Sequence, residues 1–260
     1  MKIKIYKPLT VLLVAATALS AVALPTSAEA SYNWYIRRNG NETPGFPANA
    51  AEISSYNAYF VDYRCTEKSG EKKLYLTFDA GYENGNVERI LDALKKENVP
   101  AAFFVLDNII LKNPDLVKRM TDEGHLVCNH TKRHKNLCNS TYEEIAADIG
   151  ALEAIYKEKT GLDMAKYFRF PEGKYSITAL SAVKELGYKT VFWSFAYDDW
   201  DNNRQPSAEK ALKKILDNTH SGAVMLFHPT SRTNADIFPT LIKSWRDMGY
   251  TFGTLDELTS

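Results

Sequence analysis

The chain has 260 residues, of which 45% are hydrophobic and 25% charged, so it can bury the core of one large α/β domain or two small ones. Its 32 basic and 32 acidic residues cancel, and without residues 1–30 they become 29 and 31, a net charge of −2. This balance argues against a general nucleic-acid-binding surface, and we expect no nucleic-acid partner.

The N-terminus has the parts of a secretory signal peptide. Three lysines among the first seven residues precede an apolar run from Leu9 to Leu24, and the small-x-small site Ala28-Glu29-Ala30 follows. We expect residues 1–30 to be removed by cleavage after Ala30, so that no stable membrane insertion remains. The alternative is an uncleaved membrane anchor. Both interpretations place the rest of the chain outside the cytoplasm.

The next segment, residues 31–72, is predicted to be an irregular N-terminal arm. Residues 31–62 are rich in Asn, Pro, Gly and aromatic side chains and show no sustained period of 2 or 3.6. We expect the arm to pack through its aromatic rings on a single domain that spans residues 73–260. Residues 64–73 are charged and are interpreted as a surface connection.

From Leu74 onward, apolar runs typical of strands alternate with helical patterns. The expected strands cover residues 74–79, 101–106, 126–129, 167–170, 189–195, 223–227 and 251–252. The expected helices cover residues 86–97, 114–123, 142–160, 176–186, 207–218 and 234–248. Parallel strands need crossover connections, which helices supply. We therefore predict an α/β fold with a mainly parallel sheet of about seven strand–helix units, closed into a distorted (β/α) barrel.

Local signals support the expected helix boundaries. Asn113-Pro114 is typical of a helix start, and the Thr141…Glu144 pair is typical of a capping box. Gly161 is expected to end the helix that Thr141 begins.

The three cysteines, Cys65, Cys128 and Cys138, are odd in number and do not suit a disulfide framework. Cys128 lies in an apolar run and is predicted to be a small core residue. A bridge between Cys128 and Cys138 is the alternative.

Five of the expected strands end in a polar residue with catalytic potential. These residues are Asp79, His130, Arg169, the pair Asp198-Asp199, and His228. One such ending is unremarkable, because polar residues cap strands in every kind of protein. Five of them at the carboxyl end of a barrel predict one shared site, since the loops after the strands build the site there.

His130 and His134 are the candidate metal ligands. A spacing of four residues puts two imidazoles on one face of a helical turn, within reach of one ion. A pair of surface histidines is the alternative. His125 lies near a helix end and is expected to be structural, and His220 is expected to be a cation near the last carbonyls of a helix.

Arg169 and His228 have distinct candidate roles. A guanidinium cannot act as a base, but it can hold a carboxylate in a bidentate pair and lower its pKa. A surface arginine in a loop is the alternative. His228 follows an apolar strand, and a carboxylate on its second nitrogen would make it a general acid. A buried core histidine is the alternative.

Five segments in order resemble the motifs of the polysaccharide deacetylase family, the NodB-homology domain of carbohydrate esterases. They are Thr77–Gly81, His130–His134, Arg169–Gly173, Asp199-Trp200 and Leu226–His228, and the resemblance covers residues 73–258. Residues 82–85 and 192–195 resemble a narrower branch, the sporulation-type peptidoglycan N-acetylmuramic acid deacetylases, which lead to muramic δ-lactam in the spore cortex.

The resemblance implies a role for each matching residue. Asp79 matches the general base, Arg169 the residue that orients it, and His228 the general acid, which Asp199 tunes. The backbone N–H of Glu172 matches an oxyanion donor. Tyr82 and Trp200 are expected to flank a sugar ring together with Phe227, with ordinary packing as the alternative.

The resemblance also implies a divalent metal, expected to be zinc, on His130 and His134. One position departs from the family pattern, because Ala80 stands where the family has the third ligand, an aspartate. We therefore expect weak metal binding. The narrower branch shares this departure.

The implied function is hydrolytic de-N-acetylation of N-acetylmuramic acid in peptidoglycan glycan strands by a secreted monomer, in the cell wall or the forespore intermembrane space. The alternative enzymes are an N-acetylglucosamine deacetylase of peptidoglycan or chitin and an O-acetyl esterase. A degenerate glycan-binding module is a further alternative. The presence of Asp79, Arg169, Asp199 and His228 favours an enzyme, because a decayed one is expected to lose some of them.

Overall fold

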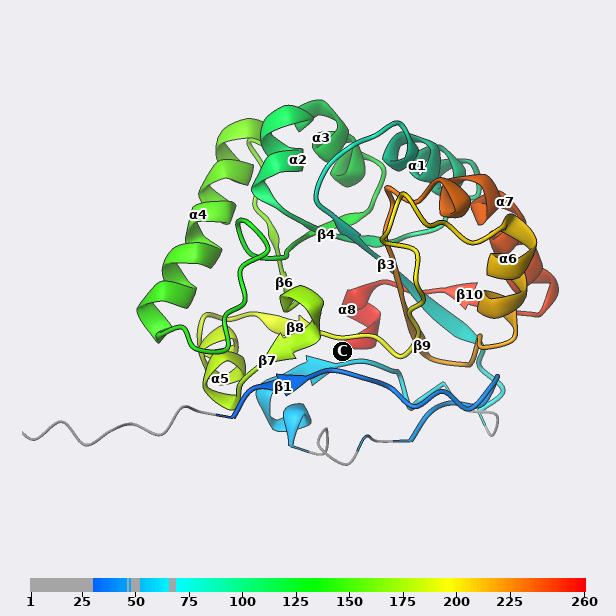
Figure 1. The fold of residues 1–260 in the computed structure, drawn as a ribbon, viewed down its shortest axis with the longest axis horizontal. Helices are drawn as coiled ribbons and strands as arrows, with labels where there is room; N and C mark the ends of the chain where they lie inside the picture. The colour runs from blue at the N-terminus through cyan, green and yellow to red at the C-terminus, as the bar shows by residue number, and fades with distance from the viewer. Residues whose placement is uncertain (1–29, 46, 48–51, 66–68) are drawn as a thin grey trace, which may run out of the picture.

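The structure, a computed structural model, describes residues 30–45, 47, 52–65 and 69–260. The predicted signal peptide, apart from Ala30, lies outside the described residues. Over the described ranges, no helix combines the length and apolar character that a membrane crossing requires. The described chain forms a curled sheet with helices over its outer face and the N-terminal arm along one side (Figure 1).

The main sheet has eight strands, and its pairings are parallel throughout. Along the sheet the strands are β10 (Thr251–Phe252), β3 (Lys73–Ala80), β4 (Ala102–Val105), β5 (Leu126–Asn129), β6 (Ala165–Phe168), β8 (Lys189–Val191) and β2 (Ala58–Tyr59), with β9 (Ala223–Phe227) also beside β3. Single-residue bridges, Val61 with Ala223 and Phe195 with Met225, join the β2 and β8 side to β9. The predicted distorted (β/α) barrel is confirmed.

Helices supply the crossovers between these parallel strands. They are α1 (Asn86–Lys96), α2 (Asp107–Lys112), α3 (Pro114–Asp122), α4 (Tyr142–Thr160), α5 (Ile177–Glu185), α6 (Ala208–Leu216) and α7 (Arg232–Asp247), whereas α8 (Leu255–Leu258) follows the last strand. The capping box of Thr141 and Glu144 is present, and Gly161 ends α4 with a left-handed φ of 75°. The sequence signals therefore place the long helices to within a few residues, but they did not predict α2 or α8.

The core lies on both faces of the sheet. All the residues of β4 and β9 are buried, as expected for parallel strands covered on both sides. Cys128 is fully buried, and Cys65, Cys128 and Cys138 form no disulfide bond. The prediction of a core cysteine is confirmed, and the alternative bridge between Cys128 and Cys138 is wrong.

The strand predicted for residues 189–195 is too long, because β8 ends at Val191. The carbonyl oxygens of Val191 and Phe192 accept hydrogen bonds from the guanidinium of Arg169, at 2.9 Å and 3.3 Å. Arg169, at the end of the neighbouring strand β6, thus binds the backbone just where β8 ends. The chain then turns, and Phe195 forms a bridge with Met225 of β9.

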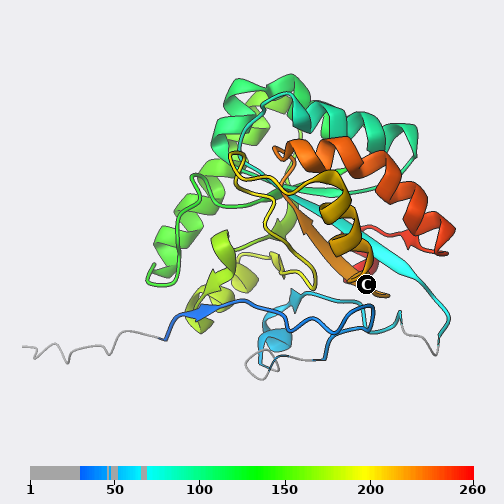
Figure 2. The same ribbon diagram turned by 45° about the vertical axis from the view of Figure 1, so that its right-hand side comes forward.

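The N-terminal arm packs on the barrel through aromatic rings, as expected. Its strand β1 (Tyr32–Asn33) pairs antiparallel with β7 (Lys174–Tyr175), and a short 3₁₀ turn, η1 (Ile53–Tyr56), precedes β2. The ring of Trp34 stacks on Phe192 with centroids 4.5 Å apart. Figures 1 and 2 both show the arm, in dark blue, running along the lower side of the molecule.

The end of the arm is anchored at the amino end of the barrel by Asp62. Its carboxylate accepts hydrogen bonds from Arg64 Nε at 2.9 Å, Arg64 Nη2 at 3.0 Å and the Tyr75 hydroxyl at 2.6 Å. The backbone of Asp62 lies so close to Gly222 that a Cβ added there would meet the Asp62 carbonyl oxygen at 2.1 Å. Glycine is therefore required at position 222, where φ is also positive.

Candidate active site

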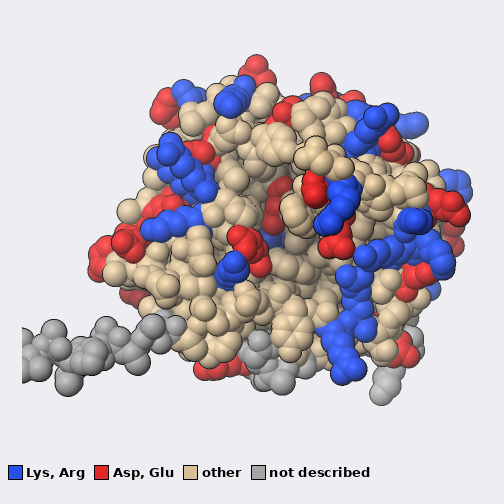
Figure 3. Space-filling view, viewed as in Figure 1, with Lys and Arg blue, Asp and Glu red and all other residues tan. Residues whose placement is uncertain are grey.

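The polar residues predicted at the strand ends surround one cavity of about 650 Å³. Its lining combines charged, imidazole and apolar side chains, namely Asp79, His134, Glu172, Trp193, Ala196, Tyr197, Trp200, Leu226 and His228. Figure 3 shows a hollow near the centre of this face, with acidic atoms visible inside it. The structure therefore brings the predicted strand ends together around this cavity.

Arg169 is the most constrained polar side chain of the site. It is fully buried and stacks over the ring of Phe104, with Cζ 4.2 Å from the ring centroid. Its Nη1 donates to Asp79 Oδ1 at 2.8 Å, and its Nη2 donates to Thr77 Oγ1 at 2.9 Å. The alternative of a surface arginine is wrong, because every edge of the guanidinium is used inside the protein.

This arrangement keeps Asp79 ionised. Burial on its own raises the pKa of the Asp79 carboxyl, but the positive charges of Arg169 and His228 and the hydrogen bond from Arg169 hold the pKa below its ordinary value. Asp79 Oδ1 is occupied by Arg169, while Asp79 also lines the cavity. A negative carboxylate with one oxygen fixed and the other near the cavity has the form of a general base.

His130 lies against the second oxygen of that carboxylate. Its Nδ1 donates to the carbonyl oxygen of Arg169 at 2.8 Å, and its Nε2 lies 3.4 Å from Asp79 Oδ2. Burial lowers the pKa of His130 to about 4, so the ring is neutral at neutral pH with its proton on Nδ1. Two lone-pair-bearing atoms, Nε2 and Oδ2, therefore face each other.

The segment from His130 to His134 is a loop, and the predicted helical turn is wrong. Thr131 and His134 have positive φ values of 65° and 58°. The amide of Lys132 donates to Asp148 Oδ1 at 2.8 Å, and the Lys132 carbonyl accepts from the amide of Asp107 at 2.9 Å. These long-range bonds replace the helical ones, yet the two imidazole rings still meet with centroids 5.0 Å apart.

The two imidazoles fit a metal with an incomplete ligand set. A His130 ring that donates Nδ1–H to a backbone carbonyl and presents a bare Nε2 has the usual arrangement of a metal-ligating histidine. A cation would also relieve the contact between Nε2 and Asp79 Oδ2. Ala80 is fully buried and supplies no ligand atom, and across the described ranges no group of three or more acidic, histidine or cysteine side chains is placed to hold an ion.

The second charged pair of the cavity is His228 with Asp199. Nδ1 of His228 lies 2.7 Å from Asp199 Oδ1, and the backbone N–H of His228 donates to Asp199 Oδ2 at 2.9 Å. Burial on its own lowers the pKa of His228, but the carboxylate of Asp199 outweighs it and raises the pKa above its ordinary value. The Asp199 carboxylate therefore favours the protonated imidazolium of His228 at the cavity wall, and the alternative of an ordinary core histidine is wrong.

Glu172 sits in a strained turn at the cavity edge. The 3₁₀ turn η2 (Pro171–Gly173) carries Glu172 at a φ of 56°, in the left-handed region. The arm fixes this turn, because the amide of Trp34 donates to the Gly173 carbonyl at 2.8 Å and the indole N–H of Trp34 donates to the Trp193 carbonyl at 2.9 Å. A Cβ at Gly173 would lie 2.8 Å from both Trp34 and Trp193.

The three aromatic side chains expected around a sugar ring have three different positions. Trp200 lines the cavity and leaves 59% of its surface exposed. Tyr82 is also exposed, but it is not among the cavity-lining residues, and its hydroxyl accepts a hydrogen bond from Asn202. Phe227 is fully buried in the core, so the expectation that it contacts a sugar is wrong.

Sequence analysis missed two further aromatic residues of the cavity wall, Trp193 and Tyr197. Both belong to the segment between β8 and Asp199, and of the two only Trp193 fell within the strand predicted for residues 189–195. The available signal was the density of aromatic residues in that segment. Asp198 is exposed, whereas Asp199 is buried and pairs with His228.

The remaining histidines lie away from this cavity. His125 is buried beside Phe103, as expected for a structural residue, with its pKa lowered by burial to about 4. His220 is also buried, and burial lowers its pKa. It is therefore neutral, and the expectation of a cation at a helix end is wrong.

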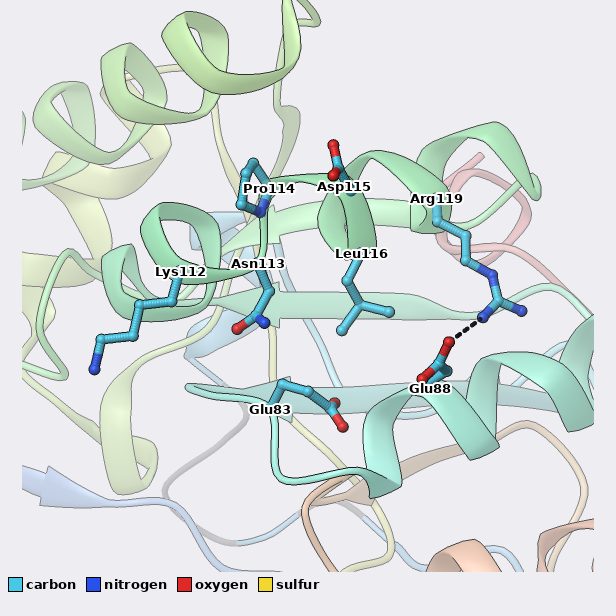
Figure 4. A pocket seen from close by; sticks show the side chains of 8 residues that line it. All are labelled: Glu83, Glu88, Lys112, Asn113, Pro114, Asp115, Leu116 and Arg119. Carbon is cyan, nitrogen blue, oxygen red and sulfur yellow. Dashed lines mark ion pairs between the residues drawn. The ribbon is translucent and has the colours of Figure 1, made fainter.

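A second cavity, of about 390 Å³, lies between α1 and the junction of α2 with α3 (Figure 4). Two of its charged side chains, Arg119 and Glu88, lie 3.9 Å apart, and Arg119 also pairs with Asp92 outside the cavity. It contains none of the residues that converge on the first cavity.

The fold and the acid–base pairs define a class of carbohydrate-modifying hydrolase. The model of the polysaccharide deacetylase family matches residues 66–191. The chain belongs to this family, and it is a hydrolase of carbon–nitrogen bonds other than peptide bonds, a polysaccharide N-deacetylase. The sequence resemblance is thereby confirmed.

Three relatives are informative. The chain is 38% identical to the peptidoglycan-N-acetylmuramic acid deacetylase PdaA of Bacillus subtilis, over 95% of this chain and 91% of PdaA. The solved structure of PdaA, a family 4 carbohydrate esterase, matches with a TM-score of 0.82 at 35% identity, over 88% of this chain and 96% of that one.

The other two relatives are more distant. A peptidoglycan-N-acetylglucosamine deacetylase of Bacillus cereus is 31% identical over 73% of this chain and 89% of its own length. A family 4 pseudoenzyme of Bacillus anthracis has a solved structure that matches with a TM-score of 0.67 at 25% identity, over 73% of this chain and 66% of that chain.

Proposed function

We propose that this protein removes the acetyl group from N-acetylmuramic acid in peptidoglycan glycan strands. The observation that carries the proposal is the pair of charged couples across one cavity, Asp79 with Arg169 and His228 with Asp199. They hold a deprotonated carboxyl and a protonated imidazole at the same pH, which amide hydrolysis requires. The choice of sugar rests on the similarity to PdaA along nearly the whole chain.

The base side of the reaction belongs to Asp79. A water molecule in the cavity attacks the acetyl carbonyl carbon and gives its proton to the free oxygen of Asp79. Arg169 fixes the other oxygen and stabilises the ionised carboxylate, so the base is oriented before substrate binds. The C–O bond forms as the carbonyl π electrons move to the oxygen, which becomes an oxyanion.

The acid side belongs to His228. The tetrahedral intermediate breaks its C–N bond, and the nitrogen takes the proton from His228 Nε2, because Nδ1 is held by Asp199. Acetate and a free sugar amine are the products. Asp199 stabilises the imidazolium, so His228 keeps its proton until the leaving nitrogen needs it.

Oxyanion stabilisation is proposed for the backbone N–H of Glu172, whose turn borders the cavity. His130 and His134 would hold a divalent metal, with zinc expected, and it would bind weakly because only two protein ligands are present. When bound, such an ion polarises an oxygen ligand and stabilises negative charge. Trp200 supplies an exposed ring for a sugar face.

The product and the expected export suggest a biological setting. A muramic acid whose peptide has been removed carries a lactyl carboxylate that can close on the new amine as a δ-lactam. We place the protein outside the cytoplasm as a monomer, in the cell wall or the forespore intermembrane space, after removal of residues 1–30. Sporulation as the occasion is part of the same proposal.

Two alternatives have relatives in their favour. The similarity to an N-acetylglucosamine deacetylase favours that sugar as a second candidate substrate. The similarity to a pseudoenzyme favours a glycan-binding module without turnover. The complete set of paired acid–base residues argues for turnover, because an inactive module has no need of them.

The test compares substrates side by side. Peptide-stripped peptidoglycan and chitin oligomers are incubated with the protein, and free amine and lactam are counted by mass spectrometry. We expect deacetylated muramic acid from peptidoglycan and little product from chitin. Equal or faster acetate release from chitin would favour the second candidate sugar, and no acetate from either polymer would favour the binding module.

A further inference from the structure

We propose that Asn234 is a positioning residue that holds the Asp199 carboxylate in line with His228. This inference rests on the proposed function in one respect, because the proposed function makes His228 the general acid. Asn234 lies in the first turn of α7, in a stretch that resembles no family motif singled out in the sequence, and it is fully buried.

Each polar atom of the Asn234 side chain has a partner in the acid pair or beside it. Its Nδ2 donates to Asp199 Oδ2 at 2.6 Å and to the carbonyl oxygen of His228 at 3.2 Å. Its Oδ1 accepts a hydrogen bond from the hydroxyl of Tyr197. Since a carboxylate can only accept, the amino side of the amide must face Asp199, and the hydroxyl of Tyr197 fixes that orientation.

The Asp199 carboxylate is consequently held at three points. Oδ1 faces His228 Nδ1, while Oδ2 receives the His228 backbone N–H and the Asn234 amide. Rotation of the carboxylate about its Cβ–Cγ bond breaks three hydrogen bonds when Asn234 is present and only two when it is absent. Asn234 thus fixes the direction from which Asp199 meets the imidazole.

A purely structural role does not account for this geometry. The amide of a residue in a first helical turn can satisfy local backbone groups, yet both donated bonds of Asn234 go to the catalytic pair. The helix start has its own cap, because Ser231 Oγ accepts the backbone N–H of Asn234 at 3.1 Å. The side chain of Asn234 is therefore free for the acid pair.

Removal of the amide should change how His228 holds its proton. When His228 is neutral, the buried Asp199 carboxylate depends on its remaining donors, and losing one makes loss of the imidazolium proton less favourable. Asp79 on β3 and Arg169 after β6 also act on His228, and Asp199 acts from the loop after β8. These three charged side chains remain in place when Asn234 is replaced, and Asp199 loses one donor.

The test is a titration of His228 by NMR, through its ring nitrogens, in the wild type and in Asn234→Leu. The resonance is identified by its loss in His228→Gln. We expect the pKa of His228 to rise by about one unit in Asn234→Leu, and kcat to fall about 10- to 100-fold with little change in KM. An unchanged His228 titration together with an unchanged kcat would overturn the inference.

Asn234→Asp separates positioning from packing. Its protonated form can still donate to Asp199, whereas its ionised form repels Asp199. We therefore expect kcat relative to wild type to recover near about pH 5 and to be lost near about pH 8. A relative kcat that does not vary with pH would contradict the inference. If Asn234→Leu does not fold, two other variants test the inference. They are Asn234→Asp and Tyr197→Phe, and for Tyr197→Phe we expect a smaller rise in the pKa of His228.

Trp245→Phe is the control for general loosening of α7. Trp245 is fully buried farther along the helix, and its indole N–H donates to Thr219 Oγ1 at 2.9 Å. We expect a lower Tm and an unchanged His228 titration. The titration needs no substrate, so it can support the inference even if the protein deacetylates no glycan, which would overturn only the proposed function. A shifted His228 titration in Trp245→Phe would instead assign the effect to helix packing.

Discussion

Two Asp–Arg pairs, one at each end of the barrel, use the same chemistry in opposite ways. At the amino end Asp62 is buried, and its partner Arg64 leaves 53% of its side chain exposed. At the carboxyl end Arg169 is buried, and Asp79 lines the cavity. In both pairs the pKa of the carboxyl is held below its ordinary value against the opposing effect of burial.

The difference lies in what the second carboxylate oxygen contacts. Asp62 Oδ2 receives Arg64 Nη2 and the Tyr75 hydroxyl, so both of its oxygens have donors. Asp79 Oδ2 faces the bare Nε2 of His130 instead of a donor. A saturated carboxylate stabilises the fold, whereas one with an unsatisfied oxygen is available to take a proton.

The largest expected effect is the loss of turnover in Asp79→Asn. An amide cannot accept the proton of the attacking water, so we expect kcat to fall about 10³-fold or more. The fold should persist, because Arg169 keeps its bonds to Thr77, Val191 and Phe192. Acetate release and thermal unfolding are measured on the same preparation. Near-wild-type turnover by a folded variant would remove Asp79 from the mechanism.

Arg169→Lys tests whether the buried partner must be a guanidinium. One ammonium cannot reproduce bonds to Asp79, Thr77 and two backbone carbonyls, so we expect about 3 kcal/mol less stability and about 100-fold lower kcat. Chemical denaturation and kinetics measure the two effects. Thr77→Val, which removes a single acceptor of Arg169, is the matched control and should show a smaller loss of both. Wild-type values in Arg169→Lys would mean that charge alone suffices.

Asp62→Asn should show the converse pattern, a loss of stability without a loss of kcat. We expect the free energy of unfolding to fall by about 2–3 kcal/mol, because a saturated buried carboxylate loses its charge-assisted bonds. The folded pKa of Asp62 is lowered, so its contribution is present above the unfolded pKa and disappears as pH falls through the folded one. The difference from wild type should therefore shrink in acid. A reduced kcat per folded molecule would show that the two ends are coupled.

The smallest expected effect concerns Ala80→Asp, which adds a carboxylate beside the unsatisfied oxygen. Without metal the variant should be less stable than wild type, because position 80 is fully buried. With zinc we expect about tenfold tighter binding, seen as a larger rise in Tm. His134→Ala in the same background should abolish that gain. Equal zinc responses of wild type and Ala80→Asp would argue that the imidazoles hold no ion.

Local sequence signals predicted much of the fold. The Thr141–Glu144 capping box and Gly161 act within a few residues of themselves, so α4 could be placed correctly. The alternation of apolar runs and helical patterns gave the parallel sheet, and the sheet brings its strand ends together. That is why Asp79 and His228 could be placed in one site before any coordinates.

The parts that were not predicted depend on contacts between distant residues. The loop from His130 to His134 follows the bonds of Lys132 to Asp148 and Asp107, which no local pattern indicates. The early end of β8 reflects Arg169, which lies 22 residues away from Val191. Asn234 looks like an ordinary polar residue of a helix start, because its relation to Asp199 exists only after folding.

The pairing of β1 with β7 has a consequence for how the protein can be divided. The family match begins at residue 66, yet Trp34 supports the turn of Glu172, and β2 extends the sheet beside β8. A fragment that starts at residue 66 and runs to the C-terminus would keep every proposed catalytic side chain and lose the neighbours of the Glu172 turn. The segment that the family model matches is therefore smaller than the segment that packs around the cavity. A protein made for experiments should begin before Tyr32.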